Sequence, residues 1–354
     1  MDSTPQNLAA PPSQTRETRR INLALQGGGT HGAFTWGALE RLLDEDWLEF
    51  DGMSGTSAGA INAAIFADGL SRGGRTGARD AMEKFWRSIG SNFGMSPMKA
   101  SALEKAIWGH DLSHSVAWNA FEALTRIASP YQLNPFSMEF NPLRRALENS
   151  LDLKHLRADK TAMRLFISAT NVRSGKPKVF RREELTVDAL LASACLPNVF
   201  KAVEIDGEAY WDGGYLGNPA LWPLYHERSA ADIILVQLNP LYREEIPTTV
   251  SDIMNRLNEI SFNASLMSEM RAIDFVQRLL EGGRLEQPRY RQIFLHAIED
   301  EPRMSKFKLS TKFNGDWDFL QTLRQYGHAA ADHFLSHGAS QLGRDSTLDI
   351  QRYL

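Results

Sequence analysis

The sequence predicts an α/β fold in which a largely parallel sheet is covered by helices on both faces. Two observations support this prediction: short apolar runs bounded by glycine or proline indicate buried strands, and they alternate along the chain with segments of helical periodicity. The chain has 354 residues, of which 43% are hydrophobic. That size is enough for one large domain or two ordinary ones with a substantial core.

Charge and cysteine content exclude several classes of protein. The formal net charge of −4 gives no global positive field, so we expect no nucleic-acid partner. The single cysteine, Cys195, forms neither an internal disulfide nor a thiolate metal cluster, which favours a reducing compartment. No apolar run approaches the roughly 18 residues of a membrane-spanning helix, and the N-terminus lacks the apolar core of a secretion signal. The expected location is cytoplasmic.

The first part of the chain alternates strand and helix signals. Residues 1–20 are polar and contain consecutive prolines, so a flexible arm is expected there. The apolar run that follows ends at three glycines, as a buried strand does when it enters a turn. The expected elements are a strand over 21–25, a helix over 32–46, a strand over 50–53, and helices over 60–66 and 77–90.

The remainder resumes this alternation after an interruption. Residues 91–140 are rich in aromatic residues and methionine without regular alternation, and we interpret them as an insertion. Asp206-Gly207 is a strong hairpin signal. The expected elements are helices over 143–151, 187–194, 254–280 and 317–337, and strands over 164–169, 203–205, 209–211, 232–238 and 292–296.

A G-x-S-x-G motif lies between an expected strand and an expected helix, with the sequence Gly55-Thr56-Ser57-Ala58-Gly59. A serine at such a turn adopts a strained backbone with its hydroxyl exposed, and the flanking glycines avoid clashes. The following helix directs its N–H groups and positive dipole end at the serine. The alternative is a small-residue turn that only lets the helix pack closely. Ser57 is therefore the candidate nucleophile, supported by Gly55 and Gly59.

The glycine-rich loop after the first strand has two interpretations. Its backbone N–H groups suit a developing oxyanion, which makes an oxyanion hole of Gly27, Gly28, Gly29, Thr30, His31 and Gly32. The loop also satisfies the dinucleotide-binding pattern G-x-G-x-x-G through Gly27, Gly29 and Gly32, with Asp51 as the expected ribose-binding acid. A dinucleotide site does not explain the serine motif, whereas acyl hydrolysis needs both elements, so we favour the oxyanion hole.

A third glycine turn carries a carboxylate. Asp212 follows the expected hairpin strand and precedes Gly213 and Gly214. Of the nine histidines, only His31 lies in a comparable strand-end glycine loop, so Asp212 is the candidate base for Ser57. The plain alternative is an aspartate that caps a glycine turn.

In this order, the three motifs resemble the patatin-like phospholipase family. The resemblance covers roughly residues 21–240, the expected catalytic domain, and Ala192-Ser193 with Pro197 and Phe200 resembles a further family segment. It implies a three-layer α/β/α fold, a serine–aspartate dyad without histidine, no metal, no cofactor, and hydrolysis of lipid acyl esters. The family usually has Arg or Lys where this chain has His31. Residues 241–354 lack these motifs and are expected to form a helical and strand extension packed on the catalytic domain.

Two weaker clusters favour ordinary explanations. His110 and His114 have a spacing similar to that of H-E-x-x-H zinc sites, but a solvated or capping pair is the favoured interpretation. The basic cluster of Arg72, Arg75 and Arg79 is more typical of a solvated loop than of a lipid-headgroup site.

The predicted function is a cytoplasmic serine acyl hydrolase that acts on phospholipids or related acyl esters. A thioesterase, an acyltransferase or a polyester (hydroxyalkanoate) depolymerase on the same fold needs the same residues, and a dinucleotide-binding protein is the alternative of another class. The expected partner is a lipid or acyl-ester substrate. For such a substrate, the insertion at residues 91–140 forms either a lid or acyl-chain wall, or an ordinary helical subdomain. Transient contact with a membrane surface is expected from this substrate, and a homo-oligomer is left open.

Overall fold

The computed structural model describes residues 17–93, 102–133, 142–226, 229–285 and 290–354. Its centre is an eight-stranded sheet with the order β5-β6-β3-β2-β1-β7-β8, in which β4 also pairs with β3. Most of the expected N-terminal arm lies outside the described residues, and the described chain enters the sheet at Arg19.

The sheet is mainly parallel, as predicted. The mutually parallel strands are β1 (Arg19–Leu25), β2 (Leu48–Thr56), β3 (Arg164–Asn171), β7 (Asp232–Val236) and β8 (Phe294–Ile298). The antiparallel strands are β4 (Pro177–Arg181), β5 (Val203–Ile205) and β6 (Glu208–Asp212). The sequence did not predict β4, because only Phe180 of its five residues is buried and the strand carries no apolar run.

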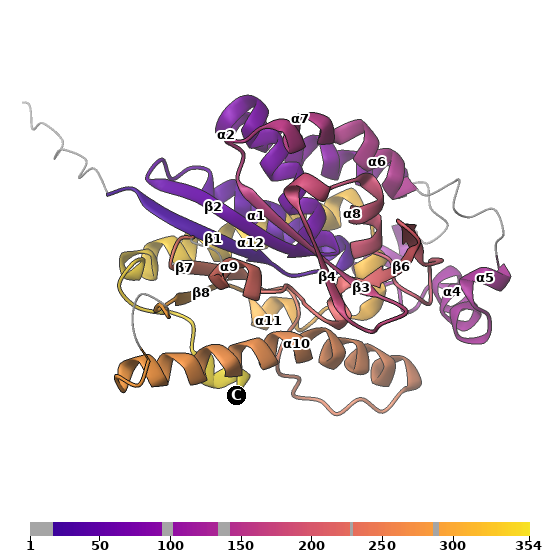
Figure 1. The fold of residues 1–354 in the computed structure, drawn as a ribbon. Helices are drawn as coiled ribbons and strands as arrows, with labels where there is room; N and C mark the ends of the chain where they lie inside the picture. The colour runs from indigo at the N-terminus through magenta and orange to yellow at the C-terminus, as the bar shows by residue number, and fades with distance from the viewer. Residues whose placement is uncertain (1–16, 94–101, 134–141, 227–228, 286–289) are drawn as a thin grey trace, which may run out of the picture.

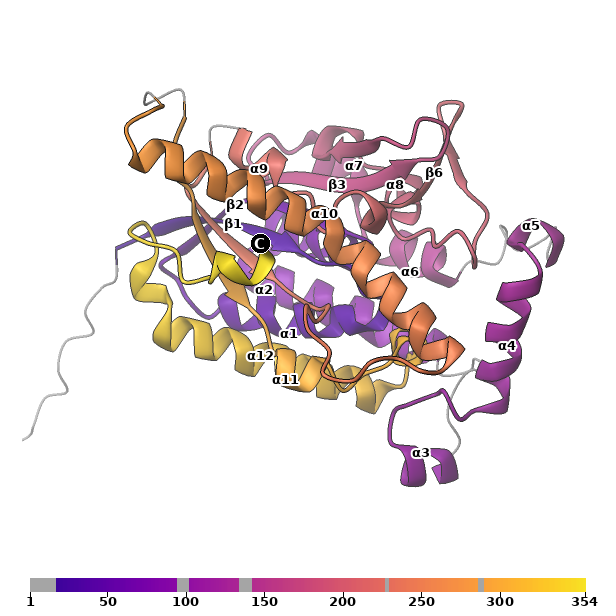
Figure 2. The same ribbon diagram turned by 90° about the horizontal axis from the view of Figure 1, so that it is seen from below.

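The three-layer α/β/α architecture is confirmed by the two cores on opposite faces of the sheet. Successive side chains of a strand point to opposite faces; accordingly Leu23 and Leu25 belong to one core and Ala24 to the other. The first face is covered by α1 (Gly32–Leu42), α2 (Ala58–Phe93), α8 (Val187–Ser193) and α12 (Trp317–His337). The second is covered by α9 (Trp222–His226) and α10 (Val250–Glu281), which runs across the sheet in Figure 2.

The helices expected over 60–66 and 77–90 are joined through a kink within α2. Gly73 and Gly74 leave the helical conformation there, and Gly69 on one side approaches Gly77 on the other. The two arms therefore pack against each other. The sequence predicted the apolar face of each arm, but not this pairing.

The expected insertion forms short helices at one end of the molecule (Figure 1), while its residues 94–101 and 134–140 lie outside the described ones. These helices are α3 (Ala102–Trp108), α4 (Val116–Ile127) and α5 (Pro130–Leu133). The remaining short helices are α6 (Pro142–Ser150), α7 (Leu153–Ala158), α11 (Glu301–Met304), and the 3₁₀ turns η1 (Gly29–His31), η2 (Arg182–Glu184), η3 (Gly213–Tyr215), η4 (Leu309–Phe313), η5 (Ala339–Gln341) and η6 (Ile350–Tyr353).

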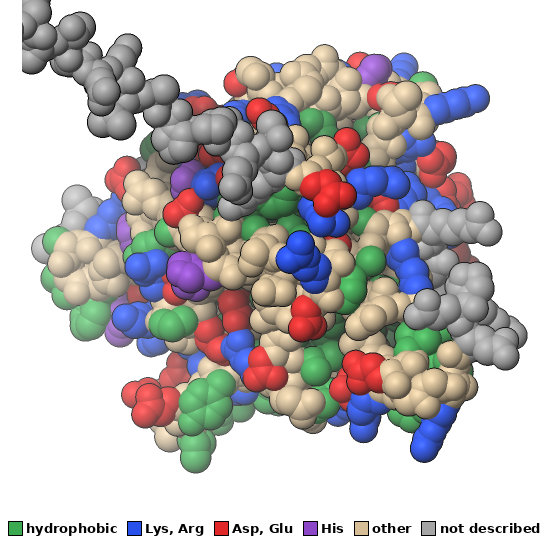
Figure 3. All heavy atoms as spheres, turned by 90° about the vertical axis from the view of Figure 1, so that its left-hand side faces the viewer, with side chains coloured by type: hydrophobic (Ala, Val, Ile, Leu, Met, Phe, Trp, Pro, Cys, Tyr) green, Lys and Arg blue, Asp and Glu red, His purple; other side chains and the backbone are tan. Residues whose placement is uncertain are grey.

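The chain after residue 240 completes the same sheet and the same helical layers. Strand β8 pairs with β7, and α12 packs along α1. Among the helices that the structure describes, none combines the length and apolarity of a membrane-spanning segment. On the face shown in Figure 3, acidic and basic side chains are interspersed.

Candidate active site

Three parallel strands deliver their following loops to one edge of the sheet. Strand β1 lies between β2 and β7, with Leu25 in register with both Gly55 and Val236. Beyond these residues, β2 leads to Ser57, β1 to the glycine loop, and β7 to Asn239. The carboxyl edge of a parallel sheet, where connections diverge to either side, is the usual place for a ligand site.

Strand register brings Asp212 to this same edge. Strand β2 pairs with β3 up to Ser168, and β6 pairs with β3 from Ala169 onwards, while β4 overlaps both pairings and so occupies the other edge of β3. The end of β2 and the end of β6 therefore meet along one edge of β3. This arrangement places Ser57 beside Asp212, although 154 residues separate them in the sequence.

Ser57 occupies the strained turn that the G-x-S-x-G motif predicts. Its φ of 54° lies in the left-handed region that non-glycine residues rarely adopt. Its N–H donates to Ser193 Oγ at 2.9 Å, and its carbonyl accepts from Ile61 N at 3.1 Å, which starts α2. At Gly59 a Cβ atom would lie 2.1 Å from Leu25 O, so only glycine allows α2 to approach β1 this closely.

Asp212 is a buried carboxylate with an unusual proton affinity. Its Oδ1 accepts from Gly214 N at 2.7 Å, and Gly213 and Gly214 form the start of η3. Burial raises the pKa of Asp212 to about 7, partly offset by Gly214 N–H, the Ser57 hydroxyl and Lys312. Among the described residues Asp212 Oδ2 has no hydrogen-bond partner with standard geometry. The Ser57 hydroxyl nevertheless lies close enough to the carboxylate to lower its pKa. Asp212 can therefore accept a proton near neutral pH.

The six candidate oxyanion-hole residues divide into two groups. Gly28, Gly29 and Thr30 line the cavity that contains Ser57. Gly27 N–H donates to Asn218 Oδ1 at 2.7 Å, and His31 N–H donates to Gly28 O at 3.2 Å, so these two donors already have acceptors. Gly32 is the first residue of α1 and packs against Ala58 of α2.

His31 points away from the cavity and is held neutral. Burial, with Lys312 and Arg243 nearby, lowers the pKa of His31 well below its usual value. Its Nε2 lies 2.8 Å from Thr311 Oγ1, which itself donates to Lys308 O. Since a hydroxyl has one proton, His31 Nε2 is the donor. The positive charge expected at this position by resemblance is therefore absent from the loop.

A segment after residue 240 holds the oxyanion loop, and sequence reasoning missed it. Gly29 has a φ of 60°, and a Cβ there would lie 2.3 Å from Lys312 O. Thr30 Oγ1 donates to Thr311 O at 2.8 Å. Lys312 Nζ donates to Asn239 Oδ1 at 2.8 Å, and Asn239 Nδ2 donates to Gly27 O at 2.9 Å. No local motif marks these residues, because they meet the loop only in the folded chain.

The site opens into a cavity of about 350 Å³ with mainly apolar walls. Among the described residues that line it, Asp212 and Lys312 are the charged ones. The apolar walls come from α2, the insertion, α6, the segment after α8, α10 and η4, and include Ile61, Phe85, Trp86, Ile89, Phe121, Leu143, Leu196, Val199, Phe200, Phe262, Leu309 and Phe313. Such a shape suits a hydrocarbon chain that leads to a polar reacting centre.

The acid required by the dinucleotide interpretation has other partners. Asp51 lies near the start of β2, whereas the glycine loop follows the end of β1. Its carboxylate accepts hydrogen bonds from Arg20, Arg164 at 2.7 Å, and Ala230 N at 2.7 Å. Because the two strands are parallel, Asp51 and the glycine loop lie at opposite ends of the sheet.

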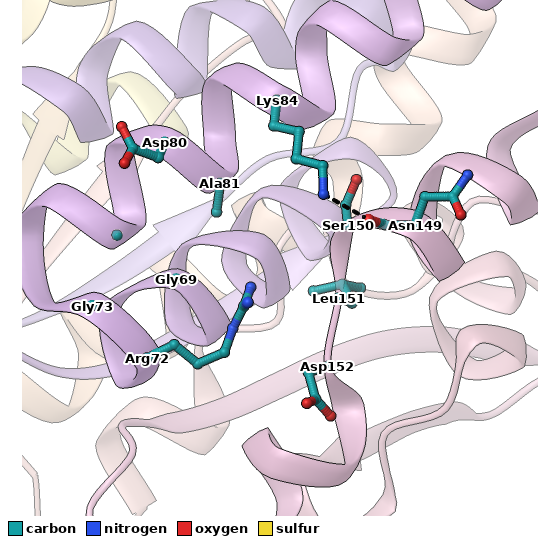
Figure 4. Close-up of a pocket in the computed structure, with 11 residues that line it drawn as sticks. Gly69, Arg72, Gly73, Asp80, Ala81, Lys84, Asn149, Ser150, Leu151 and Asp152 are labelled. Carbon is teal, nitrogen blue, oxygen red and sulfur yellow. Dashed lines mark hydrogen bonds between the residues drawn. The ribbon is translucent and has the colours of Figure 1, made fainter.

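A second cavity, of about 380 Å³, lies between the kink of α2 and residues 149–152 (Figure 4). Neither Ser57 nor Asp212 lines it. Arg72, on its wall, pairs with buried Asp68 at 2.5 Å. Arg75 donates to the carbonyls of Leu43 and Leu48, and Arg79 pairs with Asp44. The three arginines thus bind separate partners within the protein.

Two pairs of histidines spaced four residues apart, and the single cysteine Cys195, also have structural explanations. His114 stacks on Trp108 and His110 packs on Phe319, in a turn rather than on one helix face. His333 and His337 stack on each other in α12. Within the described parts of the chain, no group of three or more potential metal ligands converges. Burial, reinforced by Asp212, raises the pKa of the Cys195 thiol to about 12, so it is not an activated nucleophile.

Comparison with known proteins gives one family match and several solved structures. The model of the patatin-like phospholipase family matches residues 23–225, more than half of the chain. The crystal structure of VipD from Legionella pneumophila is 15% identical, with a TM-score of 0.38, over 88% of this chain and 67% of VipD. ExoU, solved in complex with SpcU from Pseudomonas aeruginosa, is 21% identical, with a TM-score of 0.31, over 70% of this chain and 51% of that one. The chain thus spans about half of ExoU. A search of curated proteins gives no match.

Proposed function

Because this chain belongs to the patatin-like phospholipase family, we propose that it is a serine acyl hydrolase that cleaves phospholipids or related lipid acyl esters through Ser57 and Asp212. The observation that carries the proposal is the meeting of a strained, cavity-facing serine with a buried carboxylate of raised pKa beside a glycine loop. The cytoplasmic location remains a prediction from the sequence.

In the proposed reaction Asp212 takes the proton of Ser57 as Oγ attacks the ester carbonyl. The N–H groups of Gly28 and Gly29, with Thr30, stabilise the oxyanion, and the N-terminus of α2 adds its positive dipole end. Collapse forms the acyl-enzyme, and Asp212 returns the proton to the departing alcohol. Asp212 then deprotonates a water that attacks the acyl-enzyme, and it returns this proton to Ser57 Oγ as the fatty acid leaves. These steps use neither a metal nor a cofactor.

The covalent step gives the direct test of this function. A fluorophosphonate probe should add one organophosphorus group to the intact protein, on the peptide that contains Ser57, and should abolish ester hydrolysis in parallel. A dinucleotide-binding protein would remain unlabelled. A panel of esters, thioesters, acyl acceptors and polyester would then distinguish a phospholipase from the thioesterase, acyltransferase and depolymerase alternatives.

The insertion supplies part of the proposed acyl-chain wall. Phe121 of α4 lines the cavity, whereas Trp118 is buried against Leu112, Phe121 and Phe313. Phe121→Ala should therefore lower kcat/KM for long-chain esters by about 10-fold and affect acetyl esters far less, since burying a large side chain contributes roughly 1.5–3 kcal/mol. Leu124→Ala, on an exposed residue of the same helix outside the cavity, is the matched control. Equal losses at every chain length would indicate a role in folding instead.

Helix α10 supports contact with a lipid surface because its N-terminal half is apolar on two sides. At about 100° per residue, buried Phe262 and Leu266 share one face, and the opposite face carries exposed Ile253, Leu257 and Ile260. Asn258 and Phe262 of the same helix line the cavity, so the exposed face lies on the outer side of a helix that forms part of the cavity wall.

Leu257→Glu combined with Ile260→Glu should therefore reduce hydrolysis of vesicle phospholipid by about 10-fold or more, because each side chain would otherwise bury apolar surface in the lipid. Hydrolysis of a dissolved short-chain ester is the reference activity. Phe275→Glu, which changes an exposed side chain far along the same helix, is the control for added charge. Unchanged vesicle activity in the double variant would contradict the membrane contact.

A further inference from the structure

Lys312 is a residue of the cavity wall whose ammonium group has no counter-ion within 4.0 Å among the described residues. Among the described residues, its hydrogen bond to Asn239 Oδ1 is the single one that the side chain makes, and no carboxylate lies within 4.0 Å. The neighbouring Glu259 already pairs with Arg243 and Arg256. Burial, together with Arg243, lowers the pKa of Lys312 despite the opposing effect of Glu259 and Asp212.

An ammonium group has three donors, and here the protein satisfies one of them. A charge that is withdrawn from water is costly unless an anion and further acceptors surround it. Among the described residues no carboxylate lies within 4.0 Å of this ammonium group, and Lys312 is one of the residues that line the substrate cavity. An anion that arrives with the substrate would complete the site.

The position of Lys312 indicates which part of a substrate it meets. Its backbone carbonyl contacts Gly29, so the side chain starts beside the oxyanion loop, where the reacting ester must lie. The other walls are apolar and suit the acyl chain. An anionic group close to the ester, on the alcohol side, is a feature of phospholipids and is missing from neutral acylglycerols.

We propose that Lys312 is a specificity-determining residue that binds the phosphodiester of a phospholipid whose acyl ester lies at Ser57. This inference rests on the proposed function and names its substrate class. A merely structural role is the competing explanation, since Lys312 also holds Asn239 and, through it, Gly27 O. The two roles differ in their dependence on substrate charge: loss of a structural contact weakens every substrate alike.

The test compares kcat/KM for a short-chain phosphatidylcholine and for a neutral diacylglycerol with the same chains, both below their aggregation concentrations. In Lys312→Met the ratio of the two values should fall about 10- to 100-fold, the expected loss of one hydrogen bond to a charged group. Lys312→Arg, which keeps the charge, should restore most of the ratio. Lys308→Met removes an exposed cation from the adjacent chain and should leave the ratio unchanged.

A binding experiment separates failure of this inference from failure of the proposed function. In Lys312→Met the affinity for a non-hydrolysable diether phosphatidylcholine should decrease, whereas the affinity for the neutral diether should stay the same. This result is expected whether or not the protein hydrolyses esters. If Lys312→Met lowered kcat/KM for the phosphatidylcholine and for the diacylglycerol by the same factor, so that their ratio stayed constant, the inference would be overturned. Inhibition by inorganic phosphate without any preference for the phospholipid would assign the site to free phosphate and would also overturn it.

Discussion

Ser57→Ala is expected to lower kcat/KM for every ester by about 10⁴-fold or more, because it removes the only atom that forms the acyl-enzyme in the proposed mechanism. The residual rate would come from the oxyanion loop and from substrate binding. Steady-state kinetics on a soluble ester measures this loss of activity, and mass spectrometry after fluorophosphonate treatment measures the accompanying loss of labelling at residue 57.

Ser91→Ala provides the matched control, since it changes an exposed serine of α2 whose hydroxyl, among the described residues, bonds only to Arg87 O of the same helix. This variant should be labelled and should react like the wild type. If the Ser57→Ala protein were folded, labelled elsewhere and still active, the serine hydrolase proposal would fail.

Asp212→Asn is expected to reduce kcat by about 10²- to 10⁴-fold, the usual contribution of a general base. The amide keeps an oxygen that accepts from Gly214 N but has no affinity for the Ser57 proton. Asp206→Asn is the control, because it makes the same change at an exposed hairpin turn with a φ of 51°, which asparagine tolerates. Melting temperatures of both variants would verify folding.

The pH dependence gives a second measure of the same group. Only the ionised carboxylate accepts a proton, so kcat/KM of the wild type should rise with pH through about 7, the raised pKa of Asp212, and then level off. Lys312 lowers this pKa, so Lys312→Met should move the rise to higher pH.

Replacement of each histidine by glutamine should lower kcat much less than Asp212→Asn does. The His31 variant should show the largest loss of kcat among them, because His31 lies in the oxyanion loop. An inactive histidine variant alongside an active Asp212→Asn protein would instead support a serine–histidine mechanism.

The parts of the fold that were predicted correctly have local causes. The apolar run of β1, the hairpin of β5 and β6 around Asp206-Gly207, and helix α12 follow from residue periodicity and turn chemistry within a few residues. Strand β2 extends further than predicted, because the small residues before Ser57 are buried in the sheet without forming an apolar run. Strand β4 carries too little apolar surface to be recognised from sequence.

The groups that the proposed chemistry requires can be identified from short sequence motifs. Glycine spacing encodes the conformations of the loop at Gly28, the elbow at Ser57 and the turn after Asp212, because these backbone shapes depend on residues next to one another. The sequence also revealed that His31 replaces the cation expected by resemblance.

How these groups combine depends on contacts between distant parts of the folded chain. The meeting of Ser57 with Asp212 depends on β2 and β6 sharing one edge of β3, and the raised pKa of Asp212 depends on burial by distant segments. Lys312 reaches the glycine loop from about 280 residues further along the chain, and the neighbouring Glu259 pairs with Arg243 and Arg256 instead of with Lys312. Strand order, register and desolvation arise from long-range packing, which short motifs do not encode.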